Sequence, residues 1–489
     1  ELFKEINVTP TTQSDCEIII HLYKKYGIRH TLMLLDGYFA FILYDYRTEN
    51  SEPQFIVARD PFGVRPLFIL EQNHIQDENK HNNNHITHEN IIGFASELKM
   101  LNPLLNSKKG LLTYSKPTIP YPKQVSGIKP SFTISQYPPG CYSVYKISYS
   151  LNSEWINDVK NVSYHYHRHI KNIATNSYSK EIHNETLLKI YNNLNNAVKK
   201  RVKGTTERPI ACLLSGGLDS SLITALVNKY HEGQLDTFSI GMEGSEDLKY
   251  AKEVAKYLDT NHTEIVLTPD EFFDAIPDVI RTIESYDTTT VRASVGNYLV
   301  GKYISENTDI KVVFNGDGSD ELTGGYLYFL KAPNALEFDS ECRRLINEIH
   351  FFDCLRSDRC IAAHGLEPRT PFLDRTFVDE YFTFPLCLRY PQYLSQHTKE
   401  TTCEKMLLRQ AIFKHDKDLL PIHILQRKKE AFSDGVSGNS GSWFSIIGDK
   451  VSNYNIDNSV ITDYEHNTPQ TKEQLYYRKI YDELYPNTA

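Results

Sequence analysis

The sequence feature that most constrains this chain is a short apolar run that stops at a Ser-Gly-Gly turn. Residues 210–214 read Ile-Ala-Cys-Leu-Leu, a length and composition typical of a buried strand in a parallel sheet. The run ends at residues 215–217, and apolar side chains then recur at helical spacing from Leu218 to Tyr230. A strand, a glycine-rich turn and a helix start together aim backbone N–H groups and a partial positive charge at one point. The pattern therefore predicts a phosphate site within an α/β fold.

The turn differs from the common phosphate-binding loop, because it lacks the Gly-Lys-Ser/Thr ending. Residues 215–221, Ser-Gly-Gly-Leu-Asp-Ser-Ser, instead resemble the PP-loop of ATP pyrophosphatases, which cleave ATP between the α- and β-phosphates. In this interpretation the glycines let the backbone approach the phosphates and the serine hydroxyls donate hydrogen bonds. Asp219 would hold Mg²⁺. An ordinary Ser/Gly helix start is the alternative.

Length and charge narrow the classes of protein that the chain can belong to. A chain of 489 residues predicts two or three domains with sizeable cores. A formal net charge of −9 argues against nucleic-acid binding, and no apolar stretch reaches the ~18 residues that span a bilayer. The eight cysteines form no Cys-x-x-Cys pair, so we expect reduced thiols in the cytoplasm.

Residues 1–150 are predicted to form a β-rich domain with one early helix over Asp15–Tyr26, capped by Ser14 or Asp15. Short apolar runs separated by turn residues predict an antiparallel meander with strands at 37–45, 54–58, 67–70 and 91–95. The polar segment 71–90 is predicted to be a solvated insertion. Metal binding is the weaker interpretation of its histidines, which are His74, His81, His85 and His88.

Residues 151–184 are polar and are predicted to be a linker, followed by a helix at about 185–202. Strands and helices then alternate, which predicts a parallel sheet covered on both faces with its ligand at the carboxyl ends of the strands. The expected strands are 210–214, 237–241, 263–267 and 311–315, and the expected helices include 246–258 and 270–285. Residues 335–489 are expected to form a helical lobe over the site.

Further motifs occur along the rest of the chain. They are Gln13–Ile20, Arg59–Leu67, Phe94–Glu97, Ser285–Ser294, Gly316–Glu321, His364–Asp374 and Lys429–Gly435. In this order, and together with the PP-loop, they resemble the glutamine-hydrolysing asparagine synthetase family over nearly the whole length.

The resemblance implies an α/β chain of two domains. Residues 1–150 would be an Ntn-type αββα glutaminase domain of the type 2 amidotransferase class, lacking its start. Residues 185–489 would be a Rossmann-like PP-loop ATP pyrophosphatase domain with a helical C-terminal lobe. The implied reaction activates aspartate with MgATP as β-aspartyl-AMP, releases pyrophosphate, and lets ammonia from glutamine displace AMP.

The resemblance also implies roles for particular residues. The ATP-binding set is Leu214, Ser215, Gly216, Gly217, Asp219, Ser220, Ser221, Ile240, Gly316 and Gly318. Aspartate would bind to Thr289, Thr290 and Arg292, whose guanidinium suits the α-carboxylate, and Mg²⁺ to Asp219 and Asp320. The residues implied in the chemistry are Asp317, Lys429, Thr290 and Arg292.

Three of these residues have plainer alternatives or depart from the family pattern. Asp320 could be a helix N-cap, and Lys429 could be a solvated lysine in a basic run. Asp317 lies where many relatives carry glutamate, a proposed proton acceptor, and its side chain is one methylene shorter.

The largest departure concerns the nucleophile of the glutaminase domain. Members of the family begin with cysteine, whereas this sequence begins with Glu1 and has its first cysteine at Cys16. We expect a fragment of a complete enzyme, the alternative being an enzyme that uses free ammonia. Asp15 would contact the glutamine α-amine, or act as a plain N-cap.

The sequence leaves room for other functions. The nearest rival is another PP-loop synthetase, such as one that forms a β-lactam, and a non-catalytic nucleotide-binding paralogue is a further alternative. The partners we expect are aspartate, ATP and glutamine or ammonia, and a second copy of the chain in a homodimer is possible.

Overall fold

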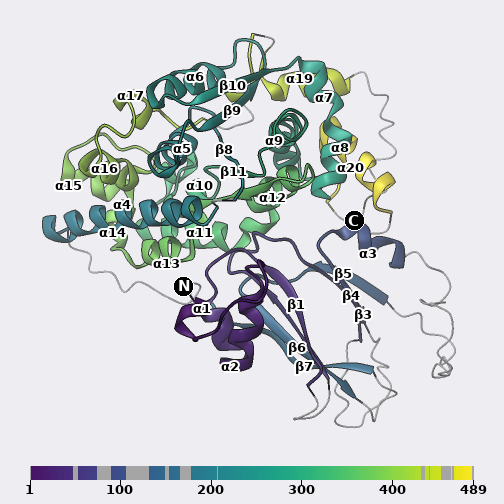
Figure 1. Cartoon of the computed structure of the whole chain (residues 1–489). Helices are drawn as coiled ribbons and strands as arrows, with labels where there is room; N and C mark the ends of the chain where they lie inside the picture. Colours follow the sequence, from purple (N-terminus) through teal and green to yellow (C-terminus); the bar gives the residue numbers. More distant parts are fainter. Residues whose placement is uncertain are drawn as a thin grey trace. The chain divides into compact units, whose positions relative to one another are not determined.

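The computed structural model describes residues 2–47, 53–73, 90–105, 131–148, 154–165, 178–205, 207–430, 435–439, 441–452, 464 and 467–486. The chain divides into two compact units, one made mainly of residues 1–166 and the other mainly of 167–484 (Figure 1). The solvated insertion predicted at 71–90 lies, with its four histidines, almost wholly outside the described residues.

The first unit contains two antiparallel sheets. One has the order β1-β2-β6-β7 and the other β4-β3-β5. The strands are β1 (Ala40–Asp45), β2 (Gln54–Arg59), β3 (Phe68–Asn73), β4 (Asn90–Ala95), β5 (Ser131–Gln136), β6 (Cys141–Ser148) and β7 (Glu154–Ser163). The four strands expected in this unit are confirmed, but they are split between two sheets and do not form one meander.

β7 corrects the linker predicted over 151–184, because residues 154–163 pair with β6 along its whole length. The polar composition of residues 154–163 gives no apolar run from which the sequence could predict a strand. β7 is an edge strand, and its side chains Val159 and Val162 pack against the buried cluster beside it.

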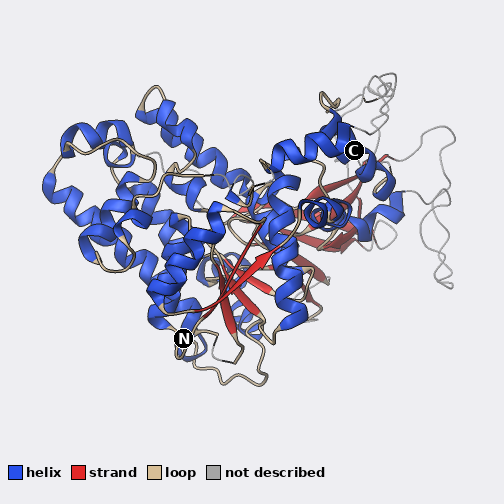
Figure 2. Cartoon of the chain, turned by 90° about the horizontal axis from the view of Figure 1, so that it is seen from above, coloured by secondary structure: helices blue, strands red, loops and turns tan. Residues whose placement is uncertain are grey.

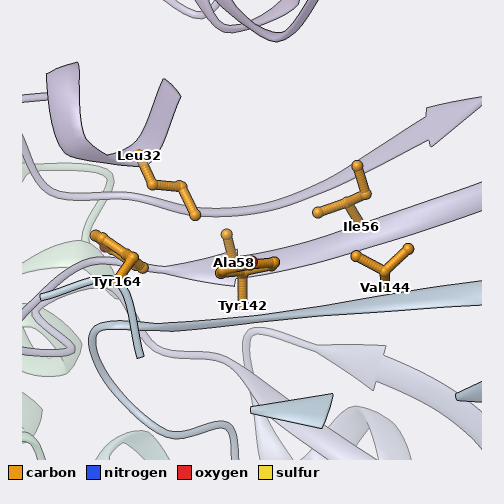
Figure 3. Close-up of a cluster of buried hydrophobic side chains, with 6 residues drawn as sticks. All are labelled: Leu32, Ile56, Ala58, Tyr142, Val144 and Tyr164. Carbon is orange, nitrogen blue, oxygen red and sulfur yellow. The ribbon is translucent and has the colours of Figure 1, made fainter. Parts of the chain in front are cut away.

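Side chains that alternate along β2 and β6 bury both faces of the first sheet. Toward α2 (Glu17–Leu34) they form the cluster drawn in Figure 3, which contains Leu32, Ile56, Ala58, Tyr142, Val144 and Tyr164. On the opposite face Val57 and Tyr145 pack with Leu67 and with Phe94 of the second sheet. The second sheet in turn packs Phe68 and Leu70 against α3 (Leu98–Leu105). The order helix, sheet, sheet, helix confirms the αββα architecture.

The start of α2 differs from the sequence prediction. The helix begins at Glu17, and neither Ser14 nor Asp15 caps it: the N-cap is Cys16, without a side-chain hydrogen bond. The Glu17 carboxylate instead accepts backbone N–H bonds from Thr11 (2.8 Å) and Thr12 (2.7 Å), and so organises the segment before the helix. A carboxylate in the first turn suits the helix dipole, which explains why no separate cap is needed. A short helix, α1 (Leu2–Glu5), precedes this segment.

The second unit is built on a five-stranded parallel sheet of order β10-β9-β8-β11-β12. The strands are β8 (Ile210–Leu213), β9 (Asp236–Gly241), β10 (Asn261–Val266), β11 (Val312–Phe314) and β12 (Glu367–Arg369). The four strands expected here and their parallel pairing are confirmed, and β12 is an addition at the edge. The strand order reverses between β8 and β11, which is where open α/β sheets bind their ligands.

Helices cover both faces of this sheet (Figures 1 and 2). On one face α5 (Leu218–Tyr230) packs on β8 and α6 (Glu246–Leu258) on β9 and β10, with α4 (Lys180–Lys203) outside α5. On the other, α9 (Thr288–Asn307) packs on β9 and α12 (Asp353–Ala362) on β12. α4 is longer at its N-terminus than the helix predicted at 185–202, because Ser179 caps it.

The helix predicted at 270–285 is wrong in one respect. Two helices, α7 (Pro269–Asp274) and α8 (Ile276–Ile283), occupy this stretch. Pro277 lies in the first turn of α8 and has no N–H to continue a preceding helix, so the chain breaks at Ala275.

The C-terminal part of the second unit is helical, as expected. Its helices are α10 (Ser319–Thr323), α11 (Ala335–Glu348), α13 (Arg375–Thr383), α14 (Leu386–Arg389), α15 (Pro391–Thr398), α16 (Met406–His415), α17 (Ile422–Leu425), α19 (Trp443–Ser452) and α20 (Lys472–Leu484). Short 3-10 turns occur at Leu327–Lys331, Ile349–Phe351 and Pro371–Leu373. Within the described ranges, no helix has the length and apolar character required to cross a bilayer.

Candidate functional site

The loops that follow β8 and β11 approach each other closely at the point where the strand order reverses. A Cβ on Gly316 would lie 2.8 Å from the Cβ of Asp219 and 2.8 Å from the backbone nitrogen of Ser220. Gly216 has φ +72°, and a Cβ there would lie 2.4 Å from the Cβ of Tyr250. Both positions therefore require glycine, one for contact between the loops and one for contact with α6.

Hydroxyl groups organise the PP-loop from within. The Ser215 and Ser220 oxygens are 3.0 Å apart, and the Ser220 hydroxyl accepts the backbone N–H of Ser215 (3.2 Å). Ser215 also accepts a long hydrogen bond from the backbone N–H of Gly217 (3.4 Å). Ser221 is fully buried and its hydroxyl has no hydrogen-bond partner among the described residues. Ser215 and Ser220 are thus the hydroxyls that a ligand can reach.

A cavity of about 730 Å³ opens over these two loops. Among the residues with predicted roles, those that line it are Leu214, Ser215, Gly217, Asp219, Ser220, Ile240, Thr289, Gly316, Asp317, Gly318, Asp320 and Lys429. Residues of the C-terminal part also line it, which agrees with the lobe expected there; they are Glu404, Lys405, Arg409 and residues 427–430. The cavity is large enough to contain a nucleotide.

Two lysines join the predicted metal carboxylates. The Lys405 ammonium lies 2.5 Å from Asp219 Oδ2 and 2.6 Å from Asp320 Oδ1, and its side chain is 1% exposed. Lys429 Nζ lies 2.6 Å from Asp320 Oδ2. The Ser319 hydroxyl donates to Asp219 Oδ1 at 2.7 Å and ties the two loops together. Four charged groups from four separate segments therefore meet at the carboxyl ends of β8 and β11.

The charges balance one another, as the pKa shifts indicate. Burial alone would raise the pKa of the Asp320 carboxyl, but the ammonium groups of Lys405 and Lys429 outweigh it and hold this pKa below its ordinary value. Burial would lower the pKa of Lys429, and the carboxylates of Asp320 and Asp219 raise it instead. At neutral pH Asp320 is ionised and Lys429 is protonated.

A second group of charged side chains surrounds Asp317, which also lines the cavity. Asp317 Oδ1 lies 3.1 Å from Arg356 Nη2, and Oδ2 accepts the side-chain amide of Asn315 at 2.9 Å. The same Arg356 nitrogen lies 3.3 Å from Asp353 Oδ2. Burial raises the pKa of Asp317 above its ordinary value, and Arg356 opposes this effect. Arg356 and Asp353 both line the cavity.

Glu321 and Tyr326 extend this cluster away from Asp317. The Tyr326 hydroxyl hydrogen-bonds to Glu321 Oε1 and lies 3.5 Å from Asp353 Oδ2. Burial, followed by the charges of Asp353 and Asp320, raises the pKa of Glu321 well above its ordinary value. The Glu321 carboxyl therefore keeps its proton to a higher pH than an ordinary glutamate does.

The alternatives for Asp320 and Lys429 are excluded. The N-cap of α10 is Gly318, so Asp320 caps no helix, and Lys429 is bonded to Asp320 inside the cavity wall.

Of the three residues predicted to bind aspartate, Thr289 is the one that lines the cavity in the described chain. The Thr290 hydroxyl donates to Asp287 Oδ1 (2.6 Å) and so belongs to the capping of α9. Arg292 is not among the cavity-lining residues of the described chain: its guanidinium pairs with the carboxylate of Glu473 (Nε to Oε1, 2.6 Å). Asp15 is exposed in the other unit.

Sequence reasoning missed Lys405, Arg356 and Asp353. Lys405 has a left-handed backbone (φ 55°) before α16, and Arg356 and Asp353 lie in the first turns of α12. No local pattern distinguishes a buried lysine from a surface lysine, because the carboxylates that bind it come from segments far away in the sequence.

The fold and this cavity define a class: a PP-loop nucleotide-binding domain in the same chain as an αββα domain. The asparagine synthase family model matches residues 189–339 and 331–489, and the glutamine amidotransferase domain model matches residues 1–148. Curated relatives named asparagine synthetase [glutamine-hydrolyzing] are 40% identical in Rattus norvegicus and 39% in Homo sapiens. Each alignment covers 98% of this chain and 78% of the relative.

The chain belongs to the asparagine synthase family. Among solved structures, NMN synthetase from Francisella tularensis matches with a TM-score of 0.22 and 14% identity, covering 46% of this chain and 98% of that one. That likeness is too slight to support an inference.

Proposed function

We propose that this chain makes asparagine from aspartate and ATP, with release of AMP and pyrophosphate and with glutamine as the nitrogen donor. The observation that carries the proposal is the meeting of Asp219, Asp320, Lys405 and Lys429 beside the PP-loop. Family membership over nearly the whole chain supports the substrate and favours neither the β-lactam nor the non-catalytic alternative.

The phosphate end of the cavity fits a magnesium nucleotide. Mg²⁺ in nucleotide enzymes is usually held by one or two carboxylates plus phosphate oxygens and water. Asp219 and Asp320 supply two carboxylates, and among the described residues no group of three or more His, Cys, Asp or Glu side chains forms a self-sufficient metal cage. Mg²⁺ held there with the phosphates would neutralise charge on the leaving pyrophosphate.

The chain's own residues would perform the rest of the activation. Leu214 and Ile240 line the cavity at the ends of β8 and β9, and their backbone groups would hold the adenosine. Ser215 and Ser220 would donate to the phosphates, and Lys429 would stabilise the charge that develops as pyrophosphate leaves. The β-carboxylate oxygen of aspartate would attack the α-phosphorus, which breaks the bond to the β-phosphate and forms β-aspartyl-AMP.

Asp317 would serve the second half of the reaction. Ammonia attacks the carbonyl carbon of β-aspartyl-AMP, the AMP oxygen leaves, and the nitrogen loses a proton. Asp317 lines the cavity and its raised pKa suits a proton acceptor. The shorter side chain is compensated by the Asn315 and Arg356 contacts, which fix the carboxylate in the cavity wall.

The first unit would supply the ammonia. Its αββα layers and the match to the glutamine amidotransferase domain support glutamine hydrolysis, with Asp15 as the contact to the glutamine amine. The domain start at 185, the homodimer and the cytoplasmic location stay predictions.

Aspartate-dependent exchange of labelled pyrophosphate into ATP tests the proposal. The wild-type chain is expected to catalyse this exchange in the presence of Mg²⁺, and the variants D219N and K429M are expected to lose it by ~10²-fold or more. Lys428→Met is a matched control, because Lys428 is exposed and borders the same cavity. Absence of exchange in folded wild-type protein would refute the proposal.

A further inference from the structure

A substrate with two carboxylates and one ammonium group needs a charged partner for each. In the proposed reaction the reacting carboxylate lies next to the α-phosphate of the nucleotide, beside the PP-loop. The second carboxylate and the ammonium group must be recognised elsewhere in the cavity, near the residue that acts on the reacting carbon. The sequence assigned this second carboxylate to Arg292, which in the structure is paired with Glu473 outside the cavity lining.

The cations that line the cavity can be sorted by their partners. Lys405 and Lys429 pair with Asp219 and Asp320 beside the PP-loop. Arg409 donates to the carboxylate and the backbone carbonyl of Glu404 and to the carbonyls of Leu425 and Arg427, so its guanidinium is committed to the chain itself.

Two further cations border the cavity. Arg427 pairs with Asp247 and Glu430 and lies over the ring of Tyr250, on the α6 side of the PP-loop. Lys428 is exposed. Neither contacts Asp317, the residue assigned to the reacting carbon.

Arg356 is the lining cation that does contact Asp317. One of its nitrogens, Nη2, contacts both Asp317 (3.1 Å) and Asp353 (3.3 Å). Another, Nε, is buried without a hydrogen-bond partner in the described part of the chain. A buried donor that lacks a partner is costly, and a ligand carboxylate would remove that cost.

We propose that Arg356 and Asp353 recognise the α-amino acid head of the substrate, Arg356 binding the α-carboxylate and Asp353 the α-ammonium. The proposal rests on the proposed function and deepens it. Both residues lie on α12, three positions apart, so their side chains project from one face of the helix.

The charge of the cluster supports this assignment. Two acidic side chains, Asp317 and Asp353, face the single guanidinium of Arg356. A zwitterionic head adds no net charge to this cluster, whereas a simple dicarboxylate such as succinate would add its second carboxylate without a compensating ammonium. The cluster should therefore select α-amino acids over dicarboxylates.

The test compares aspartate with β-alanine, which is aspartate without its α-carboxylate, in pyrophosphate exchange and as competitors. For Arg356→Gln we expect the aspartate KM to rise about 10- to 100-fold with the ATP KM unchanged. We expect the affinity for β-alanine to stay within about threefold of wild type, so the preference for aspartate falls. Asp353→Asn should relax the discrimination against succinate.

Two further variants keep the test decisive. Arg356→Lys retains the positive charge beside Asp317 and Asp353 that folding needs, but it loses the planar guanidinium. It should raise the aspartate KM by a smaller factor than Arg356→Gln does. Arg292→Gln should retain the preference for aspartate over β-alanine. The proposal is overturned if Arg292→Gln abolishes that preference while Arg356→Gln keeps it, or if the Arg356 variants weaken aspartate and β-alanine equally. No aspartate-dependent exchange in the wild type would instead refute the proposed function.

Discussion

Replacement of Lys405 by methionine should destabilise the second unit strongly. The ammonium group of Lys405 lies between Asp219 and Asp320, and its side chain is 1% exposed. Methionine preserves most of the buried volume but removes the charge, so two buried carboxylates are left with Lys429 alone. Loss of one partner from a buried ion pair costs about 3–5 kcal/mol.

The size of this effect can be read as a shift in melting temperature. In a unit of this size, each kcal/mol moves Tm by roughly 2 °C, so we expect a decrease of about 6–10 °C for K405M in a chelator-containing buffer. Scanning calorimetry should assign the change to the transition of residues 167–484, the unit that contains the site.

Millimolar Mg²⁺ should restore part of the lost stability, because a divalent ion can replace the missing positive charge between the carboxylates. The wild type should respond less, since its two lysines already neutralise them. The double variant K405M/D219N should recover part of the stability without metal. Lys428→Met is the control for the loss of a lysine from the cavity edge. A K405M protein that melts within 2 °C of wild type, with no added response to Mg²⁺, would refute this account of the site.

Three other positions give independent predictions. Gly316→Ala places a methyl group 2.8 Å from the Cβ of Asp219, so we expect the affinity for ATP, measured by equilibrium binding, to fall at least about tenfold. An unchanged affinity would contradict the close contact between the two loops. Burial raises the pKa of Asp247 to about 7, so between pH 4 and 7 the folded protein keeps a proton that the unfolded chain has lost. Urea unfolding at several pH values should therefore show that the free energy of unfolding, relative to that of D247N, falls between pH 4 and 7 and is constant above pH 7. Glu473→Gln leaves the Arg292 guanidinium without its carboxylate and should cost about 1–3 kcal/mol in the same assay, with the KM for aspartate unchanged if Arg292 does not bind substrate.

The sequence predicts those parts of the fold in which the decisive contacts are local. The run at 210–214, the Ser-Gly-Gly turn and the helix after it appear where expected, since strand, turn and helix are each specified by adjacent residues. α6 matches its prediction at 246–258, where Ser245 accepts the backbone N–H of Leu248 and caps the helix.

The missed features all depend on contacts between distant segments. β7 has too few apolar residues to be recognised, and it becomes a strand because β6 offers it an edge to pair with. The expected role of Arg292 rests on a motif, and its partner Glu473 lies 181 residues further on. Lys405 binds a carboxylate 186 residues away, so no window of sequence contains both partners.

The position of Lys405 also explains how a site with two buried carboxylates could bind a highly anionic ligand. The backbone of Lys405 is left-handed, with φ 55°, and the neighbouring Glu404 forms an ion pair with Arg409. The two lysines pair with the two carboxylates that the PP-loop and the β11 loop provide. A nucleotide that carries a counter-ion for these carboxylates would free the same ammonium groups to contact phosphate oxygens. Under the proposed function, the two lysines would therefore favour a nucleotide that carries a metal ion over a free polyphosphate, which fits their position at the carboxyl ends of β8 and β11.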